Sequence, residues 1–169
     1  ASKLFFAHYQ IEQPSIPLLH PEFSSPLFLK LFCEGLYKNG YHKIPDGYEG
    51  LSAIIDFYLD AINKVLSEKH EIPESLKIVH NVAKKISSEV VKQNGLHLKL
   101  EDAYQIVTDF AKQFSVLNCS LFFSDLKSEG LITENHYWPY KSKDYDGIYL
   151  SYERFGDHLA CSYLLDMYL

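Results

Sequence analysis

Arginine is nearly absent from this sequence, since Arg154 is the single arginine among 16 basic residues. The formal net charge is -6 and the isoelectric point is near 5.7. Binding to phosphates requires a concentrated cationic surface, and reading of the major groove relies on forked arginine contacts to guanine. The composition therefore argues against a nucleic-acid partner.

Cysteine is also scarce, and its spacing excludes two kinds of framework. The 3 cysteines, Cys33, Cys119 and Cys161, lie far apart and form no C-x-x-C pair. An odd number of scattered cysteines fits neither a disulfide-stapled domain nor a zinc site. We therefore expect a reducing, cytoplasmic environment and no metal ion in this chain.

Long hydrophobic runs are missing as well. The most apolar stretch, LSAIIDFYLDAI, is interrupted by Asp56 and Asp60, and no positively charged leader precedes an apolar segment. We expect a chain that neither spans a membrane nor is secreted. At 169 residues, with 47% hydrophobic and 22% charged residues, the sequence is typical of a globular chain with one domain or two small subdomains.

Catalytic motifs are the last notable absence. There is no G-x-x-x-x-G-K-[ST] loop to hold phosphates and no apolar strand that ends in acidic residues to hold magnesium. Asp157, His158 and Cys161 lie close together near the end of the chain, but the first two are consecutive and point in different directions on a helix. His158 and Cys161 share a stripe with Leu165 and Tyr168, so we interpret the pair as packing and expect no enzymatic activity. The remaining histidines are expected to be solvated or locally bonded: His8, His20, His42, His70, His80, His97 and His136.

Apolar residues recur at helical spacing through residues 1–70. A first helix is expected to end before Pro14, and a second to begin at Ser25-Pro26 and stop at Asn39-Gly40. A third, from about Gly50 to Glu68, presents one broad apolar face and should be a core helix. That face comprises Ile54, Ile55, Tyr58, Leu59, Ile62, Val65 and Leu66. We expect residues 1–70 to form one helical subdomain.

Residues 73–152 show a different organisation. Three short helices are expected in sequence, followed by two strands, LITEN and IYLSY. A long tip, HYWPYKSKDYDG, joins the strands and is expected to close with an Asp146-Gly147 turn. Three helices followed by a β-hairpin predict a winged helix, so the fold class is mainly α. The apolar positions that define the helices are Leu76, Val79, Val82, Ala83, Ile86, Val90, Ala103, Ile106, Val107, Phe110, Phe114, Leu117, Leu121, Phe122 and Leu126, with stops at Asn94-Gly95 and Gly130.

A winged helix could bind DNA through its third helix. Here that helix, NCSLFFSDLKSE, offers Lys127 against Asp125 and Glu129. The wing likewise sets two lysines against two aspartates: Lys141, Lys143, Asp144 and Asp146. Without a basic surface, packing against protein is favoured, and a DNA-binding regulator or a self-contained protein-interaction module are the alternatives. The wing aromatics suggest either a partner contact or a Trp138 that folds back over the hairpin: His136, Tyr137, Trp138 and Tyr140.

Residues 153–169 predict a helix with two apolar faces. One face, expected to dock on the domain, comprises Phe155, Leu159, Ala160, Tyr163, Leu164 and Met167. The other, expected to be exposed, comprises Cys161, Leu165, Tyr168 and Leu169. A helix that is apolar on most sides is normally buried on most sides, so we expect a following helical region or pairing into a homo-oligomer. The chain also begins at Ala1 in helical rhythm, which suggests that both ends are cut from a longer protein.

Two segments carry a family resemblance. EFSSPLFLKLFCEGL, residues 22–36, is similar to a segment of the helical lid behind the nucleotide-binding domain of STAND NTPases, the class that includes NACHT and NB-ARC proteins. YLSYERFGDHLACSYLL, residues 149–165, resembles the end of their winged helix. The sequence is most similar to the large bacterial antiviral STAND NTPases, and the order of lid, winged helix and next helix covers nearly the whole chain.

This resemblance implies specific roles. Pro26 lies where the lid proline of the family packs on the adenine of bound nucleotide, although Pro26 also suits the start of a helix. Tyr152 falls where many relatives have a histidine that senses ADP phosphates, and a tyrosine cannot become an imidazolium, so packing is favoured there. The resemblance implies ATP or ADP and magnesium for the parent protein and no cofactor in this chain. It also implies adjacent NTPase and sensor domains as partners, a noncatalytic relay role, and a link to antiphage defence.

Overall fold

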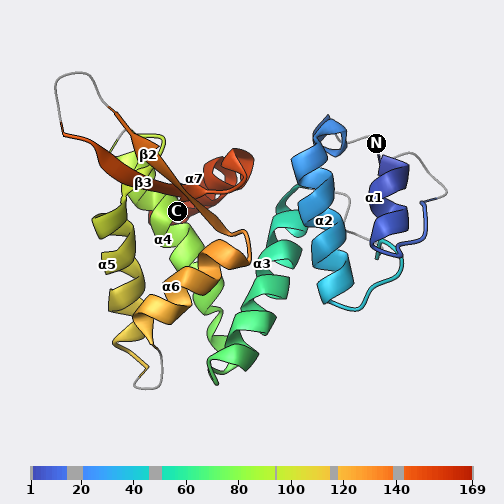
Figure 1. The fold of residues 1–169 in the computed structure, drawn as a ribbon, viewed down its shortest axis with the longest axis horizontal. Coiled ribbons are helices and arrows are strands. Elements are labelled where there is room, and N and C mark those ends of the chain that lie inside the picture. The colour runs from blue at the N-terminus through green and yellow to red at the C-terminus, as the bar shows by residue number, and fades with distance from the viewer. Residues whose placement is uncertain are drawn as a thin grey trace. The chain divides into compact units, whose positions relative to one another are not determined.

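A computed structural model describes residues 2–14, 21–45, 51–93, 95–114, 118–138 and 143–168. Over these residues the chain is mainly helical, with one small antiparallel sheet and a C-terminal helix, as the sequence predicted (Figure 1). It forms two compact units, Ala1–Ile62 and Asn63–Leu169. The division falls inside helix α3, Leu51–Lys69, whereas the sequence placed a boundary after residue 70. Each unit is described by itself below.

The first unit contains α1 (Ser2–His8), the 3-10 turn η1 (Pro21–Ser24), α2 (Pro26–Lys38) and the first part of α3. Helix α2 begins and ends where the sequence predicted. Ser25 is extended, and its hydroxyl oxygen accepts a hydrogen bond from the Phe28 amide at 3.4 Å. Pro26 follows at the first helical position, where its missing N–H costs nothing. Local residues therefore specify both ends of this helix.

The core of the first unit is built from aromatic rings. Phe23 meets Phe28 and Phe32 edge to face, with ring centroids 5.2 and 5.1 Å apart. This is the geometry that ring quadrupoles favour. The predicted apolar face of α3 is also buried through both units, apart from Val65, which is half-buried. Burial extends to Cys33, where loss of hydration raises the pKa of the thiol to about 12.

The second unit has the element order of a winged helix. Helices α4 (Ile78–Lys92), α5 (Leu100–Ala111) and α6 (Cys119–Ser128) precede the hairpin of β2 (Ile132–Tyr137) and β3 (Tyr145–Leu150). The 3-10 turn η2 (Glu74–Leu76) leads into α4, and α7 (Glu153–Tyr168) follows the hairpin. Helix α4 is central, because it contacts α5, α7 and β3. Its inner face buries Val79, Val82, Ala83 and Ile86. The buried apolar residues of the other elements of this unit include Leu98, Ala103, Val107, Phe122, Leu126, Ile132 and Ile148.

The sheet differs from the prediction in two ways. A third strand, β1 (Leu98–Lys99), pairs antiparallel with β3 and gives the order β1-β3-β2. The predicted Asp146-Gly147 turn is wrong, because both residues lie within β3. A Cβ atom at Gly147 would come within 2.5 Å of the Tyr137 ring and 2.6 Å of the His97 ring. Glycine is therefore required by two rings stacked above the strand.

Several predicted helix positions fall outside the helices. Leu76 lies in η2 and is 40% exposed, and Phe114 lies beyond the end of α5. Leu121 is on α6 but is 49% exposed, so it faces away from the core. Leu117 and Asn94 lie outside the described residues. These differences arise because apolar spacing at the edge of a helix does not tell a packed side chain from an exposed one.

Candidate functional site

Pro26 lies at the exposed N-terminal end of α2 in the first unit. Its neighbour Ser25 fixes the backbone there, and the Phe28 ring behind it is fully buried. The pyrrolidine ring is thus presented on a surface by a rigid helix start. This position suits the helix-start interpretation, and Pro26 is exposed there.

Tyr152 lies between β3 and α7 in the second unit. It is 9% exposed, and its ring meets that of Phe155 edge to face with centroids 4.9 Å apart. The Phe155 amide donates to the Tyr152 carbonyl at 3.0 Å, so the two residues form the first turn of the helix. Tyr152 is therefore placed at the junction of sheet and helix, where packing fixes the direction in which α7 leaves the sheet.

Helix α6 occupies the position of a DNA-reading helix, and its charges differ from the prediction. Asp125 was expected on the outer surface, but it is 6% exposed. The Nζ atom of Lys127, the cation that the sequence sets against Asp125 and Glu129, lies 2.7 Å from a carboxylate oxygen of Glu134 on β2. Lys127 is the only basic residue in the helix. Two of the three charges expected on this surface, those of Asp125 and Lys127, are therefore paired within the unit.

Asp125 forms a buried ionic contact with the end of α3. One carboxylate oxygen is 2.7 Å from Lys69 Nζ, and the other is 2.8 Å from His70 Nε2. Burial would raise the pKa of Asp125, but hydrogen bonds from Lys69 and His70 outweigh it and hold the pKa below its usual value. The His70 ring also meets the Phe122 ring edge to face. We call Lys69, His70 and Asp125 the polar latch.

A second polar contact joins α3 to the start of α4. Asn63 is 0% exposed, and its Nδ2 donates to the Glu74 carbonyl at 2.9 Å. Its Oδ1 accepts from the Val79 amide at 3.2 Å. Lys77, at the cap position of α4, makes no side-chain cap bond. Asn63 thus supplies from 16 residues away the cap that most helices take from their own first residue.

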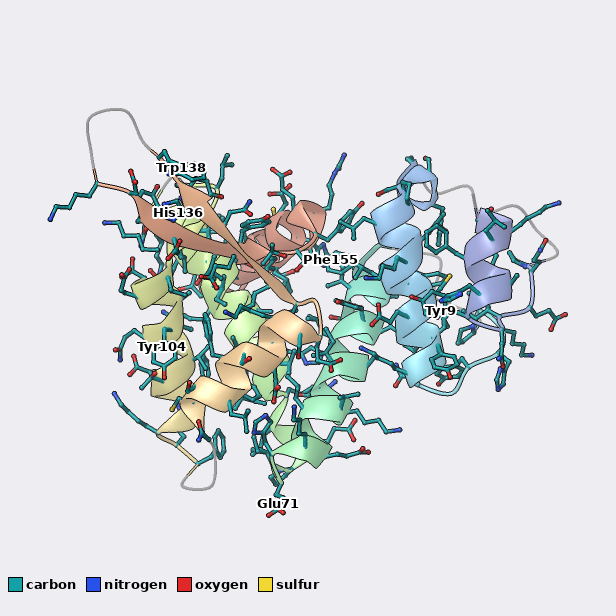
Figure 2. All side chains as sticks on the ribbon, viewed as in Figure 1. Tyr9, Glu71, Tyr104, His136, Trp138 and Phe155 are labelled. Atoms are coloured by element: carbon teal, nitrogen blue, oxygen red, sulfur yellow. The ribbon has the colours of Figure 1, made fainter. Side chains whose placement is uncertain are left out.

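The wing carries an exposed aromatic pair. Trp138 follows the end of β2 and is 74% exposed (Figure 2). Its ring meets His136 edge to face at 4.7 Å, and His136 Nδ1 lies 2.6 Å from an Asp146 oxygen. Tyr137 instead stacks on His97 at 3.8 Å. Tyr140 and Lys141 lie outside the described residues.

Helix α7 buries one side and exposes another. Phe155, Leu159 and Ala160 are buried, as predicted. Leu164 was expected to dock on the domain, but it is 40% exposed. The predicted exposed stripe includes Cys161, which is exposed, and Leu165, which is 59% exposed. The side chains of Met167 and Tyr168, and residue Leu169, lie outside the described part.

The arrangement offers little to covalent or metal chemistry. Among the described residues, no group of three or more His, Cys, Asp or Glu side chains is placed to hold a metal ion. The Ser67 hydroxyl lies near the polar latch in sequence, yet it is buried with no hydrogen-bond partner in the described structure. A serine without a base within hydrogen-bond reach is not an activated nucleophile.

Sequence reasoning missed Asn63, His70 and Asp125. His70 was expected to be solvated or locally bonded, but it is 8% exposed and bonds a residue 55 positions away. A signal was present for Asn63, which follows Leu59 by four positions and precedes Leu66 by three on the apolar face of α3. A polar residue on a buried face needs a partner, so such a position predicts a tertiary hydrogen bond.

Comparisons of the chain with models of known protein families, with curated proteins and with solved structures find no match. In the described part of the chain, every helix is too short or too polar to cross a lipid bilayer.

Proposed function

We propose that this chain is the noncatalytic relay of a nucleotide-dependent signalling NTPase of the STAND class, acting in the cytoplasm and in antiphage defence. In this proposal it couples a sensor domain to an NTPase domain elsewhere in the same parent protein. Two features support it: the resemblance of residues 22–36 and 149–165, and the chain order of a helical unit followed by a winged helix.

The surface of α6 is the observation that carries the proposal. A winged helix that reads DNA needs cations on the face that enters the groove. Here the one lysine of α6 pairs with Glu134, and Asp125 is held inward by the latch. What α6 presents outward is Leu121 with neutral polar residues. Such a face suits contact with protein, and we propose that the winged helix serves protein packing.

In the proposed relay, two packings of the parent protein compete, one favoured by ADP and one by ATP. ATP or ADP with magnesium would be held by the NTPase domain, with the exposed Pro26 ring against the adenine. Tyr152 would transmit movement between the winged helix and α7 through its contact with Phe155. The exposed side of α7, with Leu164 and Leu165, is where the proposal places the sensor domain.

The test is nucleotide retention by the parent protein. Pro26→Ala and Tyr152→Ala should each change the fraction of ADP that copurifies or the rate at which it is released. Pro21→Ala, at another exposed helix-start proline, and Tyr149→Phe, on the neighbouring strand, are matched controls that should not. Unchanged nucleotide retention in both test variants would contradict the roles proposed for Pro26 and Tyr152.

A separate measurement tests the choice between protein packing and DNA reading. The 169-residue chain should show no duplex DNA binding by fluorescence anisotropy, because α6 has no basic residue free of an internal partner. Binding that weakens steeply as salt increases would mean phosphate contacts and would favour a DNA-binding regulator instead.

A further inference from the structure

The segment that connects α3 to α4 is held in an unfavourable backbone conformation. Two of its residues, Glu71 and Lys77, are left-handed, with φ of 55° and 48°. Residues with a Cβ atom avoid this region, and glycine is the usual choice there. Figure 2 shows Glu71 beyond the last turn of α3, projecting away from the helices. Such strain persists only where neighbouring contacts hold the backbone in place.

Two sets of contacts hold this segment, one at each end. At the α4 end, Asn63 binds the Glu74 carbonyl and the Val79 amide. At the α3 end, the polar latch binds the helix terminus to α6. Glu71 lies in the turn that ends α3. The amide of the next residue, Ile72, donates to the Ser67 carbonyl at 2.9 Å and closes this turn.

The two ends differ in how easily water can replace their contacts. The Asn63 amide is fully buried and bonds only backbone groups, so its loss requires the start of α4 to unravel. The Lys69 side chain in the latch is 52% exposed, so water can compete for Asp125 from that side. Opening should therefore begin at the latch.

We propose that residues 70–77 form a conformational switch, in which the polar latch closes a strained connector and its release frees the end of α3 from α6 while the Asn63 contact stays closed. Release uncovers Phe122, which the His70 ring covers from the edge, and lets Glu71 leave the left-handed region. In the proposed relay, this switch would be the regulated joint. Only that biological role rests on the proposed function; the opening of the latch does not.

The test is amide hydrogen exchange on the 169-residue chain, without nucleotide or parent protein. In Asp125→Asn, the amides of His70 and Ile72, which close the end of α3, should exchange at least about tenfold faster. The Val79 amide, held by Asn63, and the Leu131 amide, at the end of α6, should keep their protection. Adding Glu71→Gly to this variant should slow exchange at Ile72 by about threefold, because glycine removes the strain that favours opening.

Lys69→Met provides a second, milder variant in case Asp125→Asn does not fold. It should speed exchange at His70 and Ile72 in the same direction, whereas Lys85→Met, which breaks the exposed pair with Glu89, should leave both unchanged. Equal acceleration at Val79 and Leu131 would make the latch an ordinary part of the fold and overturn the proposal. So would unchanged exchange at His70 and Ile72. Either result leaves the nucleotide-retention test of Pro26 and Tyr152 unaffected.

Discussion

The two compact units use different contacts for the same task of fixing helices. In the first, α2 takes its cap from Ser25, and its core is a cluster of phenylalanine rings. In the second, α4 takes its cap from Asn63, and α6 is tied to α3 through Asp125. Apolar packing has no pH dependence of its own, whereas an ionic contact depends on protonation and on one exact partner. The buried contact of Asp125 thus makes the second unit sensitive to protonation in a way that the phenylalanine cluster of the first unit is not.

The largest expected loss of stability tests the phenylalanine cluster of the first unit. Phe32 is 1% exposed and contacts Phe23, so Phe32→Ala should remove packing and leave a cavity. The expected loss is about 3–5 kcal/mol of unfolding free energy, measured by urea denaturation. Leu27→Ala on the same helix is the control, because Leu27 is 43% exposed and should cost less than about 1 kcal/mol. A similar loss in both variants would mean that the ring cluster is not the core of this unit.

A smaller effect is expected in the second unit, and it depends on pH. Asp125→Asn should cost about 2–3 kcal/mol at pH 7, because charge-assisted hydrogen bonds are lost. The folded-state pKa of Asp125 lies below its unfolded value, so the carboxylate stabilises the fold above about pH 4. That contribution is lost as the pH falls through the folded-state pKa.

The measurement is denaturant unfolding of wild type and Asp125→Asn between pH 7 and pH 2. The stability difference between them should shrink as the pH falls. Asp109→Asn is the matched control, since Asp109 also bonds a lysine, Lys112, but on an exposed helix face where the contact contributes little. A difference for Asp125→Asn that stays constant down to pH 2 would mean that the carboxylate charge does not stabilise the unit.

Much of the fold could be predicted because its signals are local. The start of α2 is encoded in Ser25-Pro26, and the apolar face of α3 in a repeat that spans its whole length. Strand β1 could not be predicted, since it has two residues and is a strand only by pairing with Ile148 on β3. The sequence predicts a turn at Gly147, but the glycine is needed there for a close contact with two rings. A turn and a close ring contact both select glycine, so the sequence alone does not tell them apart.

The candidate site was less predictable because its contacts join residues that are far apart in the sequence. Sequence reasoning placed Pro26 and Tyr152 by resemblance, and the adenine that Pro26 is proposed to contact would be held by another domain of the parent protein. It did not find the polar latch, because His70 and Asp125 are 55 residues apart and neither sits in a recognisable motif. Their pairing follows from how α3 and α6 pack, which single-sequence periodicity does not specify.

The smallest expected change in stability is at the end of α3, and there the substitution should stabilise the chain. Glu71 occupies the left-handed position that glycine occupies at the end of α6, where Gly130 has φ of 77°. Glu71→Gly should therefore stabilise the chain by up to about 1 kcal/mol, since the left-handed region is free of steric cost for glycine. Gly130→Ala should destabilise it by a similar amount, and thermal unfolding of the two variants measures both. If Glu71→Gly is destabilising, the backbone at Glu71 is not strained. The polar latch would then not be holding a strained connector closed.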